Sequence, residues 1–426
     1  MDGVENDGTL DGSRRRALGT LILAQALGLS GAPLVVMVGS IIGQELAPRP
    51  GFATLPLAMV VLGTALASSP VAIAMRRVGR RIGFAVGGIF AVMAGLTAAL
   101  AVEVRSFALF SLGTLLLGAT LAAVQQYRFA AAELGGADRA GRSVALVLTG
   151  GIVAGVLGPE IGKRARDLTS TPWVGSFLVL SMVYVVLVGV LLIGLPHDGP
   201  PSRATQGDGT YPRARALRRL RLRRAPHPER GSNEAPPLAT FRLLIPVAAG
   251  VTAYSVMTLA MTAAPLAMQR AGLGVDATAL VIQAHVLGMY VPSLVSGILV
   301  ERLGLGRLMV AGLLTLVGSL LAGTLGTGLG AWVASLILLG LGWNLLFLGG
   351  TVGLTTAFPG ADRFRAQALN DTLVFGARAI ASLGAGVVLA TGGWPAIQFV
   401  AVAPLMAMGL LLALRGRATA EMTPVT

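Results

Sequence analysis

The amino-acid sequence predicts an all-α polytopic membrane protein with twelve transmembrane helices, arranged as two pseudo-symmetric bundles of six. The first observation is the composition: 54% of the 426 residues are hydrophobic and 12% are charged, whereas charged residues make up about 25% of a typical soluble domain. The second is a series of long uncharged runs. The third is one long polar segment, residues 197–242, which divides these runs into two sets of similar length.

Six uncharged runs precede the polar segment, at residues 17–44, 50–75, 82–102, 106–127, 143–159 and 168–196. About 20 apolar residues cross a hydrocarbon core about 30 Å thick, so each run predicts a spanning helix. The first run is too long for the apolar region of a secretory signal, which has roughly 7 to 15 residues. We therefore expect it to be the first spanning helix.

Six further spans are expected after the polar segment. Residues 243–269 and 277–300 predict spans seven and eight. Residues 308–361 form one run of 54 uncharged residues. A single helix of that length would measure about 80 Å, so we expect two spans that turn within the Gly-rich residues 323–330. Span eleven starts near Gln367, and span twelve covers residues 394–414.

The polar segment predicts a linker on the cytoplasmic side. It holds ten Arg and four acidic residues, a composition that cannot bury a core. With both termini inside, the cytoplasmic connections hold 26 Arg and Lys and the outer ones hold six, in agreement with the positive-inside rule. For this multi-pass protein of the cell membrane we expect a cytoplasmic tail (1–16), a first bundle (17–196), the linker (197–242), a second bundle (243–414) and a cytoplasmic tail (415–426).

The net charge of +14 suits the anionic cytoplasmic leaflet better than nucleic acid, because the Arg-rich linker has hardly any aromatic residues. The linker forms either a short surface helix on lipid or a solvated tether. The chain has no Cys and three His, so we expect no disulfide, no metal site and no cofactor. It lacks the G-x4-G-K-[ST] motif of nucleotide-driven pumps and the clustered acids or His of an enzyme.

The two halves repeat at an offset of 225 residues. The tripeptide Arg77-Val78-Gly79 after span two recurs as Arg-Leu-Gly at residues 302–304, after span eight (302 − 77 = 225). Adding 225 to the starts of spans two to five gives the starts of spans eight to eleven to within about a residue. Because each half has an even number of spans, the repeat predicts two halves related by an axis along the membrane normal.

These loops resemble the signature of the major facilitator superfamily of secondary transporters, Gly-x-x-x-Asp-Arg-x-Gly-Arg-Arg. The first copy, AIAMRRVGRR at residues 72–81, has Ala72 in place of the first Gly and Arg76 in place of the acid; the second copy is GILVERLG at residues 297–304. The resemblance implies alternating access, and it assigns gating to Arg77, Gly79, Arg80, Arg81, Gly297, Glu301, Arg302 and Gly304. For the first copy, the alternative is a loop that only anchors the chain through its positive charge.

Span five contains GGIVAGVLGPEIG at residues 150–162, which is similar to the antiporter signature of the same family. Ala154 and Lys163 depart from that signature. Pro159 has no N–H for the carbonyl of Gly155, so we expect a helix kink at Gly158 and Pro159. The resemblance favours export. The alternative is close packing through small residues, with no bearing on direction.

Two charged residues of span eleven are candidate site residues. An Arg at the centre of a spanning helix costs about 2.5 to 3.5 kcal/mol, and Arg378 is expected near the midplane. Asp371 lies two turns earlier on the same face of the helix. One interpretation is a substrate-binding Arg378 with Asp371 in a charge relay. The other is a structural pair, or an Arg378 that extends to the membrane surface.

His285 in span eight and Glu160 at the outer end of span five are candidates for proton coupling. The imidazole titrates near neutral pH, and the carboxylate could take a proton from outside. The alternatives are a neutral His285 that hydrogen-bonds a neighbouring helix, and an ion pair of Glu160 with Lys163 and Arg164, at i+3 and i+4.

Hydroxyl, amide and aromatic side chains predict the walls of a substrate cavity. Ser255, Thr258 and Thr262 lie within about 60° of one another on a helical wheel of span seven. The resemblance implies that spans one, four, seven and ten surround the cavity, which adds Gln25, Trp343 and Asn344. A Trp beside an amide suits a flat, partly polar ligand.

The sequence therefore predicts a monomeric secondary transporter that moves a small organic molecule through the membrane as the two bundles rock against each other. Proton-coupled efflux is the first expectation, and proton-coupled uptake of a nutrient or metabolite is the alternative. A membrane-embedded enzyme and a non-transporting sensor are more distant alternatives.

Overall fold

The computed structural model describes residues 6–196, 236–357 and 362–420. In these ranges the regular structure consists of α-helices and short 3-10 helices, without strands. Hydrocarbon offers no hydrogen-bond partner to a backbone, so spanning segments satisfy their own N–H and C=O groups as helices. Most of the predicted linker, residues 197–235, lies outside the described residues.

The helices follow one another in two sets. The first set is α1 (Asn6–Leu29), α2 (Gly31–Leu46), the 3-10 helix η1 (Pro50–Phe52), α3 (Leu55–Val78), α4 (Arg80–Glu103), α5 (Phe107–Val124), α6 (Tyr127–Arg164) and α7 (Val174–Gly194). The second set is α9 (Pro236–Arg270), α10 (Val275–Tyr290), the 3-10 helix η3 (Val291–Val295), α11 (Ser296–Thr324), α12 (Leu329–Ala357) and α13 (Asp362–Ala420). We refer to these sets as the first half and the second half.

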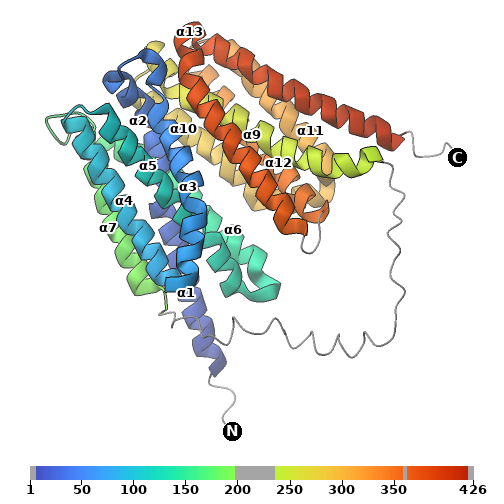
Figure 1. Cartoon of the computed structure of the whole chain (residues 1–426), viewed down its shortest axis with the longest axis horizontal. Helices are drawn as coiled ribbons and strands as arrows, with labels where there is room; N and C mark the ends of the chain where they lie inside the picture. Colours follow the sequence, from blue (N-terminus) through green and yellow to red (C-terminus); the bar gives the residue numbers. More distant parts are fainter. Residues whose placement is uncertain (1–5, 197–235, 358–361, 421–426) are drawn as a thin grey trace.

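Eleven segments of the described chain are long and apolar enough to cross a membrane. The last of them, Leu369–Arg415, has 47 residues and would be about 70 Å long as one helix, more than twice the thickness of the hydrocarbon core. It is interrupted at Gly393, where φ is 66° and ψ is −162°, and Figure 1 shows α13 turning back on itself. Counted over the described residues, twelve segments are therefore able to cross a membrane, six in each half, as predicted.

Two spans that were predicted as single helices are instead built from two pieces. Span one consists of α1 and α2, which are separated at Ser30. Pro33 follows the break and has no N–H to donate to the carbonyl of Leu29. Span eight passes from α10 into η3, which contains Pro292. In both cases a proline removes a hydrogen bond that a continuous helix would need.

Helix α6 is much longer than the uncharged run that predicted span five. It has 38 residues, or about 57 Å, so its polar first part continues beyond an apolar segment of ordinary length. The helix continues through Pro159 without interruption. The polar residues that precede the uncharged run are helical too, which hydropathy alone does not reveal.

The repeat that was predicted from the loops is present in the backbone. Gly79, between α3 and α4, has φ 84° and ψ 164°, and Gly304, inside α11, has φ 71° and ψ 161°. This region of φ and ψ is accessible essentially to glycine alone. Two residues 225 positions apart therefore make the same tight turn, one in each half.

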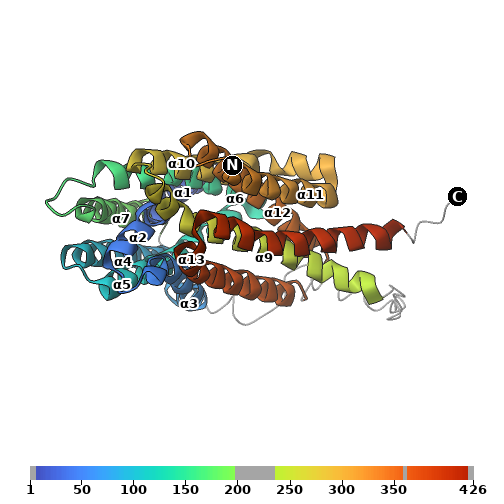
Figure 2. The ribbon, with the colours of Figure 1, turned by 90° about the horizontal axis from the view of Figure 1, so that it is seen from above.

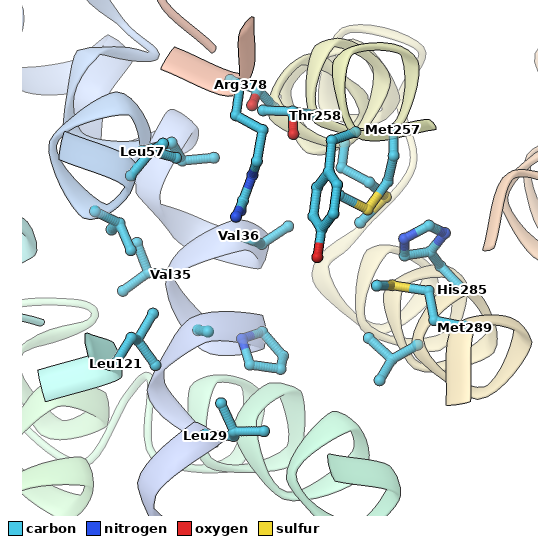
Figure 3. A pocket seen from close by; sticks show the side chains of 18 of the residues that line it. Leu29, Val35, Val36, Leu57, Leu121, Met257, Thr258, His285, Met289 and Arg378 are labelled. Atoms are coloured by element: carbon cyan, nitrogen blue, oxygen red, sulfur yellow. The ribbon is translucent and has the colours of Figure 1, made fainter. Parts of the chain in front are cut away.

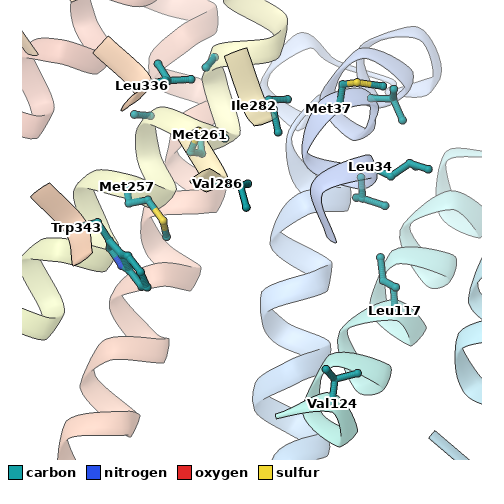
Figure 4. Packing of buried hydrophobic residues seen from close by; sticks show 14 of the residues in the cluster. Leu34, Met37, Leu117, Val124, Met257, Met261, Ile282, Val286, Leu336 and Trp343 are labelled. Atoms are coloured by element: carbon teal, nitrogen blue, oxygen red, sulfur yellow. The ribbon is translucent and has the colours of Figure 1, made fainter. Parts of the chain in front are cut away.

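The two halves lie side by side, with the first half on the left and the second half on the right of Figures 1 and 2. A single cluster of buried hydrophobic residues extends through both halves. Figure 4 shows Ile282 and Val286 of α10 facing Leu34 and Met37 of α2 across the boundary. Apolar packing therefore joins the halves as well as stabilising each of them.

Polar contacts also join the halves, at the end of the bundle that contains η1, the last turn of α6 and the first turn of α10; we call this the joined end. The Thr54 hydroxyl donates to the carbonyl oxygen of Ser382 over 3.3 Å, and Lys163 Nζ lies 3.5 Å from Asp276 Oδ1. Toward the opposite end, where α1 begins, the ribbons of α3 and of the first part of α13 diverge in Figure 1.

The paired glycine turns give a stability prediction. Replacing Gly79 or Gly304 by Ala forces a Cβ into a backbone conformation that costs about 1 to 3 kcal/mol, so both Gly79→Ala and Gly304→Ala are expected to lower the midpoint of thermal unfolding of the purified protein in detergent. Gly306→Ala is the matched control, because Gly306 has ordinary helical geometry and nothing within 4 Å of an added Cβ. An unchanged midpoint for Gly79→Ala would contradict the structure at this turn.

Candidate functional site between the two halves

A cavity of about 240 Å³ lies between the two halves. Figure 3 shows side chains from both halves pointing into it. Its polar and aromatic lining residues are Thr64, Gln125, Tyr254, Thr258, Thr262, His285, Tyr290, Trp343, Arg378 and Ser382. The remaining lining residues are apolar, and none of the described lining residues is acidic.

The wall from the first half is almost entirely aliphatic. It is formed by α1, α2, α3, α5 and α6 and presents side chains such as Val35, Val36, Leu57 and Leu121, with the amide of Gln125 at the end of α5 as an exception. Its hydroxyl group, on Thr64, already donates to backbone, with the carbonyl oxygens of Val60 at 2.8 Å and Gly118 at 3.0 Å. This wall therefore offers a ligand mainly dispersion contacts and a dry surface.

The wall from the second half is aromatic and polar. Tyr254 of α9 makes edge-to-face contacts with Trp343 and Phe347 of α12, with ring centroids 5.1 Å apart in both pairs. Trp343 and Phe347 are stacked, with their planes 13° apart. Such clusters fix the orientation of each ring. Tyr254 and Trp343 therefore present rigid surfaces to the cavity.

Arg378 of α13 enters the cavity from the same wall. Its Cζ lies 4.7 Å from the centroid of the Tyr254 ring and 5.8 Å from that of Phe375. These are cation–π contacts, which stabilise a guanidinium without consuming its N–H groups. Its Nε is buried and has no hydrogen-bond partner among the described residues. Figure 3 shows the guanidinium directed toward Val36 on the facing wall.

Asp371 does not pair with Arg378. Its side chain is exposed, accepts a hydrogen bond from Asn370 Nδ2 over 3.2 Å, and is not among the lining residues of the cavity. The two residues share a face of α13, but seven residues of helix separate their Cα atoms by about 10 Å. Of the two candidates in span eleven, the structure brings only Arg378 to the cavity.

The hydroxyl residues of α9 divide between the cavity and its edge. Thr258 and Thr262 line the cavity. The Oγ1 of Thr262 lies 3.4 Å from Ser382 Oγ, and the buried Oγ1 of Thr258 has no partner within the described chain. Ser255 does not line the cavity, because it lies about 100° around the helix from Tyr254, at the margin of the face that does.

His285 has features of both interpretations that the sequence left open. It lines the cavity, and its Nδ1 lies 2.8 Å from the carbonyl oxygen of Leu336 on α12. A carbonyl only accepts, so Nδ1 carries a proton and, in the neutral ring, Nε2 is left as an acceptor. The side chain is 2% exposed. A role of this group in proton coupling stays a prediction.

Glu160 lies at the joined end and not on the cavity. Its Oε1 is 3.1 Å from Lys163 Nζ and accepts a hydrogen bond of 3.1 Å from Gln283 Nε2 on α10, while its Oε2 is 2.8 Å from Arg164 Nε. The ion pairs with Lys163 and Arg164 are those expected from their spacing. The contact with Gln283 was not foreseen, and it makes Glu160 a bridge between the halves.

Two predicted substrate-binding residues pack between helices instead of lining the cavity. Asn344 Nδ2 donates to the carbonyl oxygen of Met289 over 2.7 Å and to Ser293 Oγ over 2.6 Å, so it holds α12 against the break between α10 and η3. Gln25 is 6% exposed, and its Cβ lies against the position of Gly150 on α6. The Asn344 amide bonds the backbone of a neighbouring helix and so stabilises the helix contact, whereas Gln25 contributes close packing.

The predicted gate residues lie at the end opposite the joined end. Arg80 forms an ion pair with Glu133 of α6, and Arg81 donates to the carbonyl oxygen of Leu192 at the end of α7. Glu133 thus supplies the acid that the first loop lacks. Arg77 and Arg302 are exposed. The side-chain surroundings of Gly297 and Glu301 lie outside the described residues, and gating stays a prediction.

The glycines of α6 permit close packing on two sides. A Cβ at Gly158 would overlap the carbonyl oxygen of Ser30, and one at Gly155 would overlap Val286 of α10. At Gly151 an added Cβ would lie 3.3 Å from the Tyr290 ring. One face of α6 therefore approaches the backbone near the break in span one, and another face approaches the second half.

The sequence analysis missed several lining residues of α9. Tyr254, Met257 and Met261 line the cavity together with Thr258 and Thr262, and these five positions are spaced i, i+3, i+4, i+7 and i+8, which is one face of a helix. The sequence signal that could have identified them is this stripe of Tyr, Met and Thr at helical spacing. Tyr290 was also missed.

In the described part of the chain no group of His, Asp and Glu side chains is arranged to hold a metal ion.

Two curated relatives match nearly the whole chain, although no protein-family model matches it. The chain is 36% identical over 400 residues to the riboflavin transporter RfnT of Brucella anthropi, a match that covers 93% of this chain and 94% of that protein. It is 26% identical over 412 residues to the uncharacterized MFS-type transporter YdeG of Bacillus subtilis, covering 95% of this chain and 93% of that protein.

Solved structures share the fold at low sequence identity. A D-xylose-proton symporter matches with a TM-score of 0.67 and 14% identity, over 92% of this chain and 96% of that chain. A bacterial homologue of the human lysosomal transporter Spinster, solved in an inward-facing and unoccupied conformation, matches with a TM-score of 0.62 and 13% identity, over 96% of each chain. Together with the relatives, the twelve crossings and the duplicated glycine turns, these matches identify the chain as a multi-pass membrane transporter of the major facilitator superfamily, and not an enzyme.

Proposed function

We propose that the chain transports riboflavin or a closely related flat heterocycle across the membrane. The observation that carries this proposal is the aromatic wall formed by Tyr254 and Trp343, with Arg378 stacked on Tyr254. Flat conjugated rings bind between rigid aromatic and aliphatic surfaces through dispersion and stacking. A relative that matches nearly the whole chain is named a riboflavin transporter, which supports the same class of ligand.

The proposed route is alternating access around this cavity. The halves are in contact at the joined end, and the distribution of Arg and Lys along the chain argues that the opposite end faces the cytoplasm. In the conformation described, a ligand would then enter or leave the cavity from the cytoplasmic side. Transport would require the contacts at the joined end to break while the predicted gate residues close the other end.

Proton coupling is the second part of the proposal. His285 supports it, because the imidazole lies on the cavity wall and keeps one nitrogen available as an acceptor. The glycine-rich face of α6 supports export in exchange for protons, through its likeness to an antiporter signature, and uptake with protons is the alternative. Glu160 would couple a proton to the opening of the joined end, a role supported by its hydrogen bond to Gln283 across the contact between the halves.

Riboflavin counterflow tests the substrate without assuming a direction. Proteoliposomes that contain the purified full-length chain and unlabelled riboflavin are expected to accumulate labelled riboflavin with saturable kinetics, and labelled D-xylose should not accumulate. Tyr254→Leu removes the stacking surface and should raise the half-saturating concentration roughly 2- to 10-fold. Phe399→Leu is the control, because Phe399 is 79% exposed on α13. If wild-type vesicles show no riboflavin counterflow, the proposed substrate is wrong.

An imposed pH gradient tests the coupling ion. We expect a gradient across the vesicle membrane to drive net riboflavin movement in the wild-type protein, in the direction that export by proton exchange requires. His285→Ala and Glu160→Gln should abolish the response to the gradient and leave some counterflow, because counterflow needs no net driving force. Net transport that ignores the gradient, with both variants unimpaired, would remove proton coupling from the proposal.

A disulfide across the joined end tests the movement of the halves. An added Cβ at Gly51 would lie 3.7 Å from Cγ2 of Val387 and more than 4 Å from its Cβ, so two Cys here approach the Cβ–Cβ separation of about 3.5 to 4.5 Å that a disulfide needs, and the chain has no other Cys to interfere. Oxidation of the Gly51→Cys, Val387→Cys double variant should reduce transport to background, and dithiothreitol should restore it. Each single variant is a control. Full transport in the oxidised double variant would exclude opening at this end.

A further inference from the structure

The two walls of the cavity differ in chemistry, and this difference would orient a bound heterocycle. Around Val36 and Leu57 the wall of the first half is aliphatic, with Gln125 and the already bonded Thr64 as its polar residues, whereas Tyr254, Thr258 and Arg378 belong to the second half. A ligand with one polar edge and one apolar end is accommodated in one orientation only, since the reverse orientation would place its polar edge against hydrocarbon.

Arg378 determines what kind of polar edge the cavity accepts. A guanidinium is a donor only, with five N–H groups in a planar fork, and it remains charged in proteins. Within the described chain Arg378 has aromatic partners but no ion pair or hydrogen bond, and no acidic residue lines the cavity with it. A ligand therefore has to supply acceptors, and a cationic ligand is disfavoured.

The stacking of Arg378 on Tyr254 adds geometry to this requirement. With the Cζ 4.7 Å from the ring centroid, the tyrosine restricts the plane in which the guanidinium lies. A guanidinium held in one plane donates best to a carbonyl oxygen that lies in that plane, a directional preference that the freely rotating ammonium of Lys lacks. Figure 3 shows Thr258 beside Arg378, and its unpartnered hydroxyl can accept from a ligand N–H.

We infer that Arg378 and Thr258 bind the cyclic imide edge of the substrate, C(=O)–NH–C(=O), and that the aliphatic wall around Leu57 takes the opposite, apolar end of the ring. This inference rests on the proposed function, because riboflavin carries an imide at one end of its ring system and two methyl groups at the other. It assigns specificity to the second half and leaves the first half as a surface for the ring.

A thermodynamic cycle between protein and ligand tests the assignment. Binding to the purified full-length chain is measured for riboflavin, for riboflavin methylated on its imide nitrogen, and for riboflavin without its two ring methyl groups. Wild type should bind riboflavin roughly 10- to 100-fold more tightly than the imide-methylated form, because methylation removes the N–H from which Thr258 accepts a hydrogen bond and leaves that buried hydroxyl unpaired. In Thr258→Val most of this discrimination should disappear. In Arg378→Met the affinity for both ligands should fall by a similar factor, because the imide carbonyl that Arg378 binds is present in both.

The other end of the ring provides the internal control. Removing the ring methyl groups should weaken binding equally in wild type and in Arg378→Met, and the loss should become smaller in Leu57→Ala. Arg307→Met, at an exposed position of α11, should behave as wild type with all three ligands. Arg378→Lys keeps the charge without the fork, so it should fold even if Arg378→Met does not, and it should lose part of the affinity for riboflavin and for the imide-methylated form alike.

The possible failures are distinguishable. No riboflavin binding by the wild-type protein would overturn the proposed function. Riboflavin binding with unchanged affinity in Arg378→Met and Arg378→Lys, and with unchanged discrimination against imide methylation in Thr258→Val, would leave the proposed function intact and overturn the assignment of the imide edge to Arg378 and Thr258. Coupling of the ring methyl groups to Arg378, and not to Leu57, would show that the ligand binds in the reverse orientation.

Discussion

The constraint on which the structure depends is that hydrocarbon supplies no hydrogen-bond partner. Backbone groups are therefore paired within helices, and polar side chains inside the bundle are used mainly to hold one helix against another. Ser319 and Ser335 donate to each other's carbonyl oxygens over 2.8 and 2.9 Å, and Asn344 donates to the backbone of α10. Arg378 is the contrast, because its N–H groups face the cavity without a partner in the described chain. A charged donor that lines the cavity and has only aromatic partners in the described chain indicates where a ligand binds.

The twelve crossings could be predicted because hydrophobic length alone decides whether a segment spans the membrane. The duplicated turn could also be predicted, since Gly79 and Gly304 stand in matching sequence contexts and both adopt backbone conformations reserved for glycine. The breaks at Ser30 and after Tyr290 were missed, although Pro33 and Pro292 signal them. Prolines in spanning helices are often tolerated, so a proline alone does not tell whether the helix bends or is interrupted.

The cavity could be predicted only in part, because its lining depends on the rotation of each helix against its neighbours. Thr258, Thr262, Trp343 and Arg378 were expected and lie on it. Gln25, Ser255 and Asn344 were expected on the same basis and do not. On a helix that is apolar on all sides, the polar pattern does not reveal which face meets another helix and which meets the cavity. The aromatic and methionine positions of α9 carried that information, since they complete a stripe at helical spacing.

The unequal walls of the cavity have a consequence for how such a protein diversifies. The two halves share a backbone plan, down to the glycine turns, yet the groups able to recognise a ligand are concentrated on α9, α10, α12 and α13. Substitutions on these helices would alter ligand preference without touching η1 or α6, where the halves make contact. In a duplicated chain of this kind, substitutions in the second half can change the ligand that is bound, while the first half keeps the surfaces on which the movement of the halves depends.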